Sequence, residues 1–110
     1  MARLATHVWV GAYLGRLAGA GVFAHIIHRG DPTAGAIAVK VAFMNGRASL
    51  WSRTYGLEGG LGWGVEIADA PEAEIDAAIA RAHARDRDLW VIEVEDPRGR
   101  HLLEDPTLSG

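Results

Sequence analysis

Residues 29–41 constrain the fold of this chain more than any other stretch, because a tight turn there leads directly into an extended segment. Asp31-Pro32 begins the turn, since proline presets φ and an aspartate side chain accepts hydrogen bonds from backbone N–H groups just beyond it. We expect Gly35 to supply a positive φ before the chain straightens. The sequence therefore predicts the first corner of a β-sheet here, between strands at 23–29 and 36–43.

Length and composition limit the chain to one domain and narrow its chemistry. A chain of 110 residues can bury one core without covalent staples. It contains no cysteine, which excludes disulfides, thiol nucleophiles and thiolate zinc sites, and which fits the reducing cytoplasm where we expect the protein to be. Residues 1–54 carry six basic side chains and one acidic, whereas residues 55–110 carry five and thirteen. Such a split is typical of an anion-binding face or of two oppositely charged ends of one molecule.

The first predicted helix covers residues 7–20 and carries two stripes. One stripe is apolar, with the i, i+3, i+4, i+7 spacing of a buried helix face. The other consists of Gly11, Gly15 and Gly19, each of which costs about 1 kcal/mol relative to alanine inside a helix. We expect this second stripe to pack within the domain, the alternative being contact with a second subunit. No membrane span is expected, because Arg16 at the centre of the apolar stretch 8–27 would cost about 2.5–3.5 kcal/mol to insert.

The remaining elements follow from turn signals and periodicity. Asn45-Gly46 predicts a hairpin between strands at 36–43 and 47–54, and with the strand at 23–29 these would form an antiparallel meander. A second helix is predicted at 71–85, followed by a central strand at 89–95 that is apolar on both faces at its start. The glycine-rich segment 55–63 is expected to be a surface loop, 100–104 an edge strand, and 105–110 a frayed tail.

The fold class predicted from these elements is mixed α/β (α+β), in a single domain over residues 1–104. The predicted order is α-β-β-β-α-β with a C-terminal edge strand added, and the sheet is mixed and contains the antiparallel β-meander. A three-layer α/β/α sandwich and a two-layer α+β domain both fit this order. In the three-layer form we expect the alanine-rich face of 36–43 to pack on the glycine-striped helix, and its Ile/Val face to pack on the second helix.

Four segments carry a resemblance to a known family: Arg29-Gly-Asp-Pro-Thr-Ala-Gly-Ala-Ile, Pro71-Glu-Ala-Glu-Ile-Asp, Asp88-Leu-Trp-Val-Ile-Glu-Val-Glu-Asp and Gly99-Arg-His. In that order they are similar to the short bacterial proteins catalogued as domain of unknown function 1491. The resemblance spans nearly the whole chain and implies a bacterial protein made of one domain. It implies no activity, substrate or cofactor, so it assigns no functional residues.

The residues do not predict an enzyme. His25 and His28 are three apart in a strand and are expected to point to opposite faces, and the other histidines are scattered singly, so no metal site or cofactor is predicted. The element order is also that of restriction-endonuclease-like nucleases, which need carboxylates on their second and third strands to hold Mg²⁺. Residues 47–54 contain no carboxylate, so no catalytic residue is predicted, and an enzyme with this order but without those carboxylates stays an alternative.

Two groups of residues are candidates for binding. Asp31 and Thr33, with Lys40 within reach, would form a small polar site, although ordinary turn hydrogen bonds explain the first two equally well. Trp51, with Lys40 on the neighbouring strand, would offer single-stranded nucleic acid a stacking platform, or would pack in a core or an interface. We expect packing, because thirteen acids must share the surface of so small a domain. The candidate binding residues are Arg29, Asp31, Thr33, Lys40, Trp51 and Arg53.

The function expected from the sequence is that of a small cytoplasmic, non-enzymatic binding or protein-interaction domain. Its expected partner is a second copy of the chain, as a homodimer, or another protein. The alternative is a nucleic-acid-binding module that uses a basic and aromatic face of the sheet.

Overall fold

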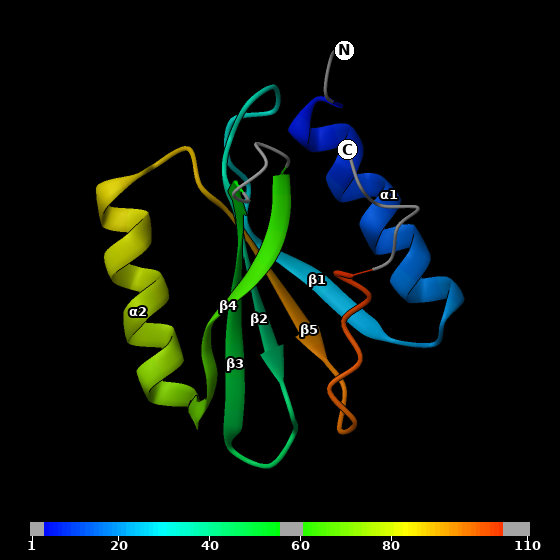
Figure 1. Cartoon of the computed structure of the whole chain (residues 1–110), viewed down its shortest axis with the longest axis vertical. Helices are drawn as coiled ribbons and strands as arrows, with labels where there is room; N and C mark the ends of the chain where they lie inside the picture. The colour runs from blue at the N-terminus through cyan, green and yellow to red at the C-terminus, as the bar shows by residue number, and fades with distance from the viewer. Residues whose placement is uncertain (1–3, 56–60, 105–110) are drawn as a thin grey trace.

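Two helices lie on opposite sides of one five-stranded sheet, so the chain folds as three layers (Figure 1). The structure is a computed structural model and describes residues 4–55 and 61–104. In chain order the elements are α1 (Thr6–Gly19), β1 (Phe23–His28), β2 (Ile37–Ala42), β3 (Arg47–Tyr55), β4 (Leu61–Pro71), α2 (Glu72–Arg85) and β5 (Trp90–Glu95). The predicted mixed α/β class is confirmed, and of the two arrangements left open the α/β/α sandwich is correct.

The strands are ordered β1-β5-β2-β3-β4 across the sheet. β2 and β5 run parallel, and every other neighbouring pair is antiparallel. All six residues of β2 are buried, which places this strand at the centre of the domain. The antiparallel meander consists of β2, β3 and β4 rather than of the first three strands. β1, expected beside β2, pairs with β5 and forms one edge of the sheet.

One strand, β4, was not predicted. Glycines that suggested a loop over 55–63 also fill the start of this strand, where Gly62 and Gly64 alternate with Trp63 and Val65. Ladder hydrogen bonds to β3 hold this part of the backbone extended despite the low strand propensity of glycine. Residues 56–60 of the predicted loop, and the tail 105–110, lie outside the described residues.

Residues 100–104 do not form the expected edge strand. Leu102 has φ 56°, which interrupts an extended backbone, and Leu103 turns inward and is buried in the core beside α1. The segment thus covers part of the α1 side of the sheet and adds no strand to it.

The two faces of the sheet support separate cores. On the α1 side, Trp9 and Tyr13 pack against the large residues of β2, which are Ile37, Val39 and Val41. On the α2 side, the buried residues are Ala38, Ala48, Leu50, Ala70, Ile75, Ile79, Leu89 and Val91. The predicted pairing of faces and helices is therefore wrong. The small side of β2 leaves room for the two isoleucines of α2, while the broad branched side meets the aromatic residues of α1.

The glycine stripe of α1 points away from the sheet. Gly11, Gly15 and Gly19 are exposed, and a Cβ atom added at any of them would meet no atom of residues 4–55 or 61–104 within 4 Å. The prediction that this stripe packs inside the domain is wrong, because Trp9 and Leu17 supply the buried face instead. Neither α1 nor α2 is long and apolar enough to cross a membrane.

Candidate functional site

The turn at residues 29–35 connects the start of α1 to the sheet through backbone hydrogen bonds. The N–H groups of Thr6 and His7 donate to the carbonyl oxygens of Thr33 (3.1 Å) and Pro32 (2.9 Å). One carboxylate oxygen of Asp31 accepts from the N–H groups of Thr33 (3.2 Å) and Ala34 (2.7 Å). Asp31 and the backbone of Thr33 are thus engaged within the turn, which is the ordinary role of these residue types there.

The same turn is pressed against β5 at Trp90. The indole N–H of Trp90 donates to the carbonyl oxygen of Asp31 (2.7 Å), and the guanidinium carbon of Arg29 lies 5.1 Å from the centre of the Trp90 ring. A Cβ atom added at Gly30 would overlap the carbonyl oxygen of Asp88, and one at Gly35 would lie 2.5 Å from it. Gly35 does not have the positive φ that we expected. It is needed because the backbone of Asp88 approaches too closely for a side chain.

Trp51 lies on the α1 face of the sheet, where it is partly buried against the core. Its ring centre is 4.3 Å from that of His101, and its N–H group donates to the Ser49 hydroxyl (3.2 Å). Arg53 lies on the same face, with its guanidinium carbon 5.2 Å from the ring of Trp9. These contacts give Trp51 and Arg53 packing roles.

Lys40 lies on the opposite face, under α2. In the β2–β3 ladder Lys40 is opposite Leu50 of the α2-side core, whereas its neighbour Val39 is opposite Trp51. The sequence grouped Lys40 with Trp51, and the alternation of side chains along a strand separates them. The six candidate residues therefore fall into three places: the turn, the α1 face, and a charged cluster around Lys40.

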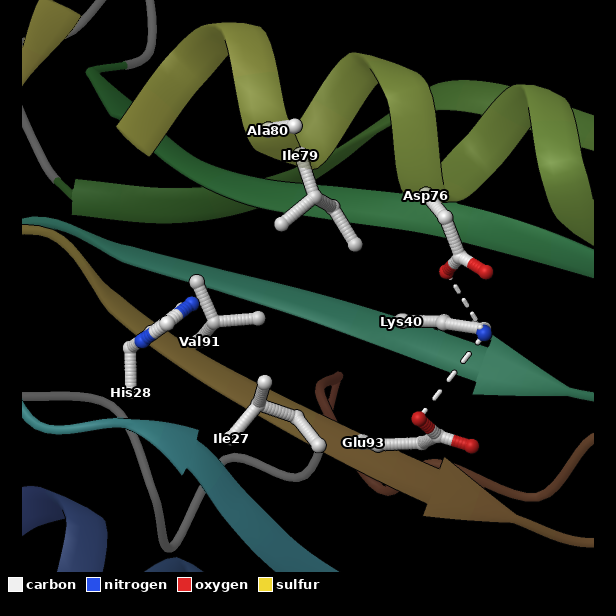
Figure 2. Close-up of a pocket in the computed structure, with 8 residues that line it drawn as sticks. All are labelled: Ile27, His28, Lys40, Asp76, Ile79, Ala80, Val91 and Glu93. Carbon is white, nitrogen blue, oxygen red and sulfur yellow. Dashed lines mark hydrogen bonds and ion pairs between the residues drawn. The ribbon is translucent and has the colours of Figure 1, made fainter. Parts of the chain in front are cut away.

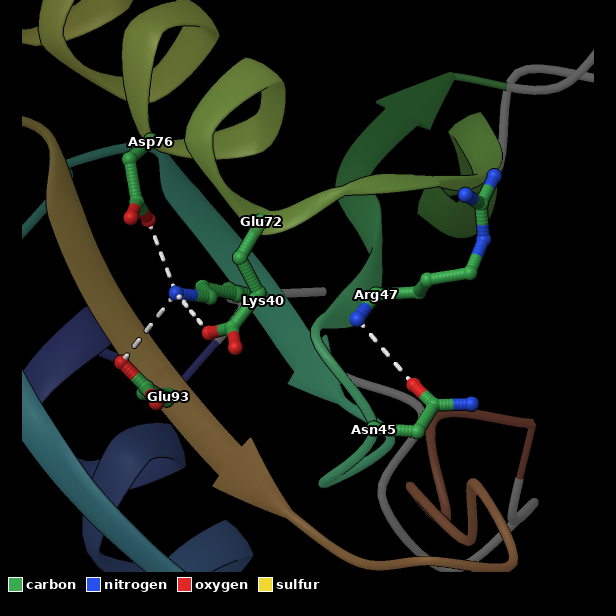
Figure 3. Close-up of polar contacts among 6 residues, drawn as sticks. All are labelled: Lys40, Asn45, Arg47, Glu72, Asp76 and Glu93. Carbon is green, nitrogen blue, oxygen red and sulfur yellow. Dashed lines mark hydrogen bonds and ion pairs between the residues drawn. The ribbon is translucent and has the colours of Figure 1, made fainter.

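The Lys40 cluster joins β2, β5 and α2 (Figure 3). The Lys40 ammonium nitrogen is 2.8 Å from a carboxylate oxygen of Glu72, 2.8 Å from one of Asp76, and 3.8 Å from one of Glu93. Only 6% of the Lys40 side chain is exposed, against 60% for Asp76. Burial alone would lower the pKa of Lys40, but the hydrogen bonds to Asp76 and Glu72 and the charge of Glu93 outweigh it and raise the pKa. Lys40 therefore stays protonated, and it is not a nucleophile at neutral pH.

A pocket of about 250 Å³ lies beside this cluster, between α2 and the strands β1, β5 and β2 (Figure 2). One end is apolar, with Ile79 on α2 facing Ile27 and Val91 on the sheet. The other end is formed by three members of the Lys40 cluster, Lys40, Asp76 and Glu93. The residues that line the pocket are Ile27, His28, Lys40, Asp76, Ile79, Ala80, Val91 and Glu93. Sequence analysis found only Lys40 among them, because the pocket depends on β1 lying next to β5.

A β-bulge in β1 places His28 in this pocket. His25 pairs with Glu93 and His28 with Val91, with the ladder shifted by one residue between Ile26 and His28. The two histidines consequently share a face, contrary to the prediction that they point apart. His28 stacks on His83 of α2 with the ring centres 4.2 Å and the planes 5° apart. Within residues 4–55 and 61–104, no three His, Cys, Asp or Glu side chains are placed to hold a metal ion.

The pocket continues onto a part of the sheet that α2 does not cover. α2 packs over β2, β3 and β4, while the same face of β1 carries two exposed apolar side chains, Phe23 (64% exposed) and Ile27 (42% exposed). The β1–β5 register places glutamates of β5 beside them. We call this surface the open face; it consists of Phe23, His25, Ile27, His28, Glu93 and Glu95.

Comparison with known proteins supports the resemblance found in the sequence. Residues 4–104 match the model of a protein family described as "Protein of unknown function (DUF1491)". A crystal structure of a DUF1491 family protein from Caulobacter crescentus CB15 is 38% identical, with a TM-score of 0.85 over 94% of this chain and 98% of that one. An NMR structure of a DUF1491 family protein from the same bacterium is 37% identical, with a TM-score of 0.82 over 96% and 97% of the two chains.

A third solved structure is more distant. The solution structure of protein Atu0922 from A. tumefaciens is 29% identical, with a TM-score of 0.75 over 86% of each chain. No curated protein matches the chain. The family model covers nearly all of the sequence, and the solved structures named here are of bacterial proteins with the same fold. The chain therefore belongs to the DUF1491 family of proteins of unknown function.

Proposed function

We propose that this protein is a small, non-enzymatic protein-interaction domain of the bacterial cytoplasm, and that it binds its partner through the open face and the adjoining pocket. The observation that carries the proposal is the exposure of Phe23 and Ile27 on a part of the sheet that α2 does not cover, next to the pocket under α2. Apolar side chains gathered next to a polar rim are typical of interaction sites. The lack of cysteine fits the reducing compartment.

The geometry of β1 favours an extended partner. Among the strands that the structure describes, β1 is an edge strand and pairs only with β5. Its other side presents backbone N–H and C=O groups, to which an added strand can pair. The bulge at Ile27 limits regular pairing to the residues before it, and it turns the side chain of Ile27 toward the pocket (Figure 2).

Binding is favoured over catalysis because the polar candidate residues already form ion pairs or hydrogen bonds within the domain. Lys40 is held protonated by three carboxylates, and Asp31 is hydrogen-bonded within its own turn.

The nucleic-acid alternative is disfavoured by the placement of the basic residues. Lys40 and Trp51 lie on opposite faces, and Arg53 packs over aromatic rings.

A homodimer is the second form of this proposal, and one observation favours it. The exposed stripe of Gly11, Gly15 and Gly19 meets no residue of the described part of the domain, which therefore gives these helix-weakening glycines no packing role. A bare helix face lets a second backbone approach closely. Sedimentation velocity at high micromolar concentration tests this form, and a strictly monomeric profile would remove it.

Selection of peptides from a display library is the direct test of the interaction proposal. Random extended peptides are selected on the purified protein, and the selected peptides are titrated into labelled protein while its amide resonances are followed. We expect shifts concentrated in β1, β5 and the facing side of α2. Selected peptides that shift α1 or the 29–35 turn instead, or the absence of any selected peptide, would refute the proposal.

A further inference from the structure

The charged end of the pocket presents carboxylate oxygens and hides the ammonium group. The exposed fractions of the side chains are 38% for Glu72, 60% for Asp76 and 19% for Glu93, against 6% for Lys40. Figure 3 shows the three carboxylates arranged around the Lys40 nitrogen. A group that enters the pocket therefore meets negative charge first.

One ammonium does not neutralise three carboxylates. The Lys40 nitrogen lies 2.8 Å from a carboxylate oxygen of Asp76, 2.8 Å from one of Glu72 and 3.8 Å from one of Glu93. One positive charge among three carboxylates leaves two formal negative charges in excess. Glu95 adds another carboxylate further along the open face. A positively charged group in the pocket would offset this excess, whereas an anionic group would add to it.

The other end of the pocket requires an apolar stem. Ile27, Ile79 and Val91 form that end, and the whole pocket, at about 250 Å³, is smaller than the roughly 300–1,000 Å³ of typical small-molecule sites. It therefore suits one long side chain better than a cofactor. Lysine and arginine carry a cation on an aliphatic stem that packs along apolar surface.

We infer that the open face binds an extended basic segment of a partner protein, with a lysine or arginine side chain of that segment in the pocket. The inference rests on the proposed interaction function and names the chemistry of the partner. The positive group lies beside Asp76 and Glu93, the carboxylates that line the pocket, and its stem lies along Ile27 and Val91. A peptide fits better than a free amine, because the six residues of β1 span about 20 Å of sheet edge and expose Phe23 outside the pocket.

Defined peptides test this inference. Three blocked nine-residue peptides of alternating valine and polar residues carry lysine, glutamine or glutamate at the polar positions, and n-butylamine serves as the free amine. Each is titrated into labelled protein at 50 mM salt. We expect the lysine peptide to bind at least tenfold more tightly than the glutamine peptide, with shifts on the open face. Its affinity should fall several-fold at 300 mM salt, because added ions screen exposed charges.

The outcomes separate the inference from the function on which it rests. Equal binding of the lysine and glutamine peptides at the open face would contradict the inference that the partner segment is basic, and would leave the interaction function standing. If butylamine binds as tightly as the lysine peptide, the inference that the ligand is a peptide segment is wrong. If no peptide shifts the open face, both the inference and the proposed function fail.

Substitutions on the open face provide a second test. Glu93→Gln and Glu95→Gln should each weaken the lysine peptide about two- to fivefold. Glu74→Gln is the matched control, because Glu74 is exposed on α2 two residues from both Glu72 and Asp76, and therefore on another side of the helix. A loss of affinity in Glu74→Gln as large as in Glu95→Gln would show an effect of net charge alone and overturn the site. Thermal unfolding of each variant identifies any loss of fold, and Glu95 remains informative if Glu93→Gln is unstable.

Discussion

Lys40 and Trp51 lie on opposite faces of the sheet, although they occupy neighbouring strands and are only one register position apart. Trp51 pairs with Val39 and faces α1, while Lys40 pairs with Leu50 and faces α2. One basic and aromatic surface containing both residues therefore cannot form. The two residues serve separate layers, so their substitutions should have unrelated effects.

Removal of the Lys40 charge should destabilise the fold and do so less at acidic pH. In Lys40→Met the three carboxylates lose their shared cation, and we expect a loss of about 1–3 kcal/mol at pH 7, below the 3–5 kcal/mol of a fully buried pair because the partners are partly exposed. The loss should shrink as the pH falls through about 4, where carboxylates become protonated. Denaturant unfolding at pH 7 and pH 4 measures this effect, and a loss that does not depend on pH would contradict it.

The raised pKa of Lys40 also predicts an alkaline limit for the wild type. The folded state binds the Lys40 proton more tightly than the unfolded state, whose lysine has a pKa near 10.5. The stabilisation is therefore complete below about pH 10.5 and is lost as the pH rises through the folded value. Unfolding curves between pH 9 and 12 should show a steeper loss for the wild type than for Lys40→Met.

Trp51→Ala should destabilise the domain by about 2–4 kcal/mol, somewhat below the range for a fully buried tryptophan. The variant loses the contact with His101 and the packing against the α1-side core. Trp51→Phe keeps an aromatic ring and should lose less. Chemical denaturation measures both variants, and a loss under 1 kcal/mol for Trp51→Ala would show that the ring does not support the core.

Two glycine-to-alanine substitutions should have opposite effects. Gly35→Ala should destabilise by about 3 kcal/mol, because its Cβ would lie 2.5 Å from the Asp88 carbonyl oxygen and 2.9 Å from a ring carbon of Trp90. Gly11→Ala should stabilise by about 0.5–1 kcal/mol, since the position is open and helical. Thermal unfolding compares the two. If Gly11→Ala destabilises instead, and does so only at concentrations where the wild type is dimeric, the exposed stripe is an interface.

His101 should make the fold less stable below pH 6.5. Burial lowers the pKa of His101, with Glu104 opposing it, and the ring nitrogen accepts a hydrogen bond from the Leu103 N–H group (3.0 Å). The unfolded state therefore binds a proton at His101 more tightly than the folded state does. The contribution of neutral His101 to the free energy of unfolding is complete above about pH 6.5 and is lost as the pH falls through the folded pKa. The difference in melting temperature between pH 7.5 and pH 5 should be smaller in His101→Gln than in the wild type. Equal differences would contradict this role.

Local signals predicted the parts of the fold that local interactions determine. The hairpin at Asn45-Gly46 connects β2 and β3 as expected, with the side chain of Asn45 accepting a hydrogen bond from the Arg47 N–H group (3.0 Å). The helix at 71–85 and the strand at 89–95 are each correct to within one residue. These elements have strong turn residues at their ends, and their periodicity is not interrupted by glycine.

The features that the sequence did not predict depend on pairing between strands that are distant in the chain. β4 begins in glycines that read as a loop and is extended because β3 supplies its hydrogen bonds. The pocket exists because β5 lies between β1 and β2, and no local pattern records that insertion. The bulge at Ile27 likewise reversed the expected direction of His28. Candidate site residues chosen by type were therefore dispersed, while most of the pocket's lining came from residues that looked like ordinary strand and helix positions.

The place of β5 between β1 and β2 sets an order of assembly on the ribosome. The segments that form β2, β3, β4 and α2 leave the ribosome before the segment that forms β5, and the hairpin contacts among them close short loops. The segment of β1 emerges first among the strands, but β5 (Trp90–Glu95), with which it pairs, is the last strand to be translated. A nascent chain that ends at residue 88 and is tethered to the ribosome by a linker long enough to hold it outside the exit tunnel should therefore contain a β2–β4 meander that resists proteolysis, while residues 23–28 are cleaved.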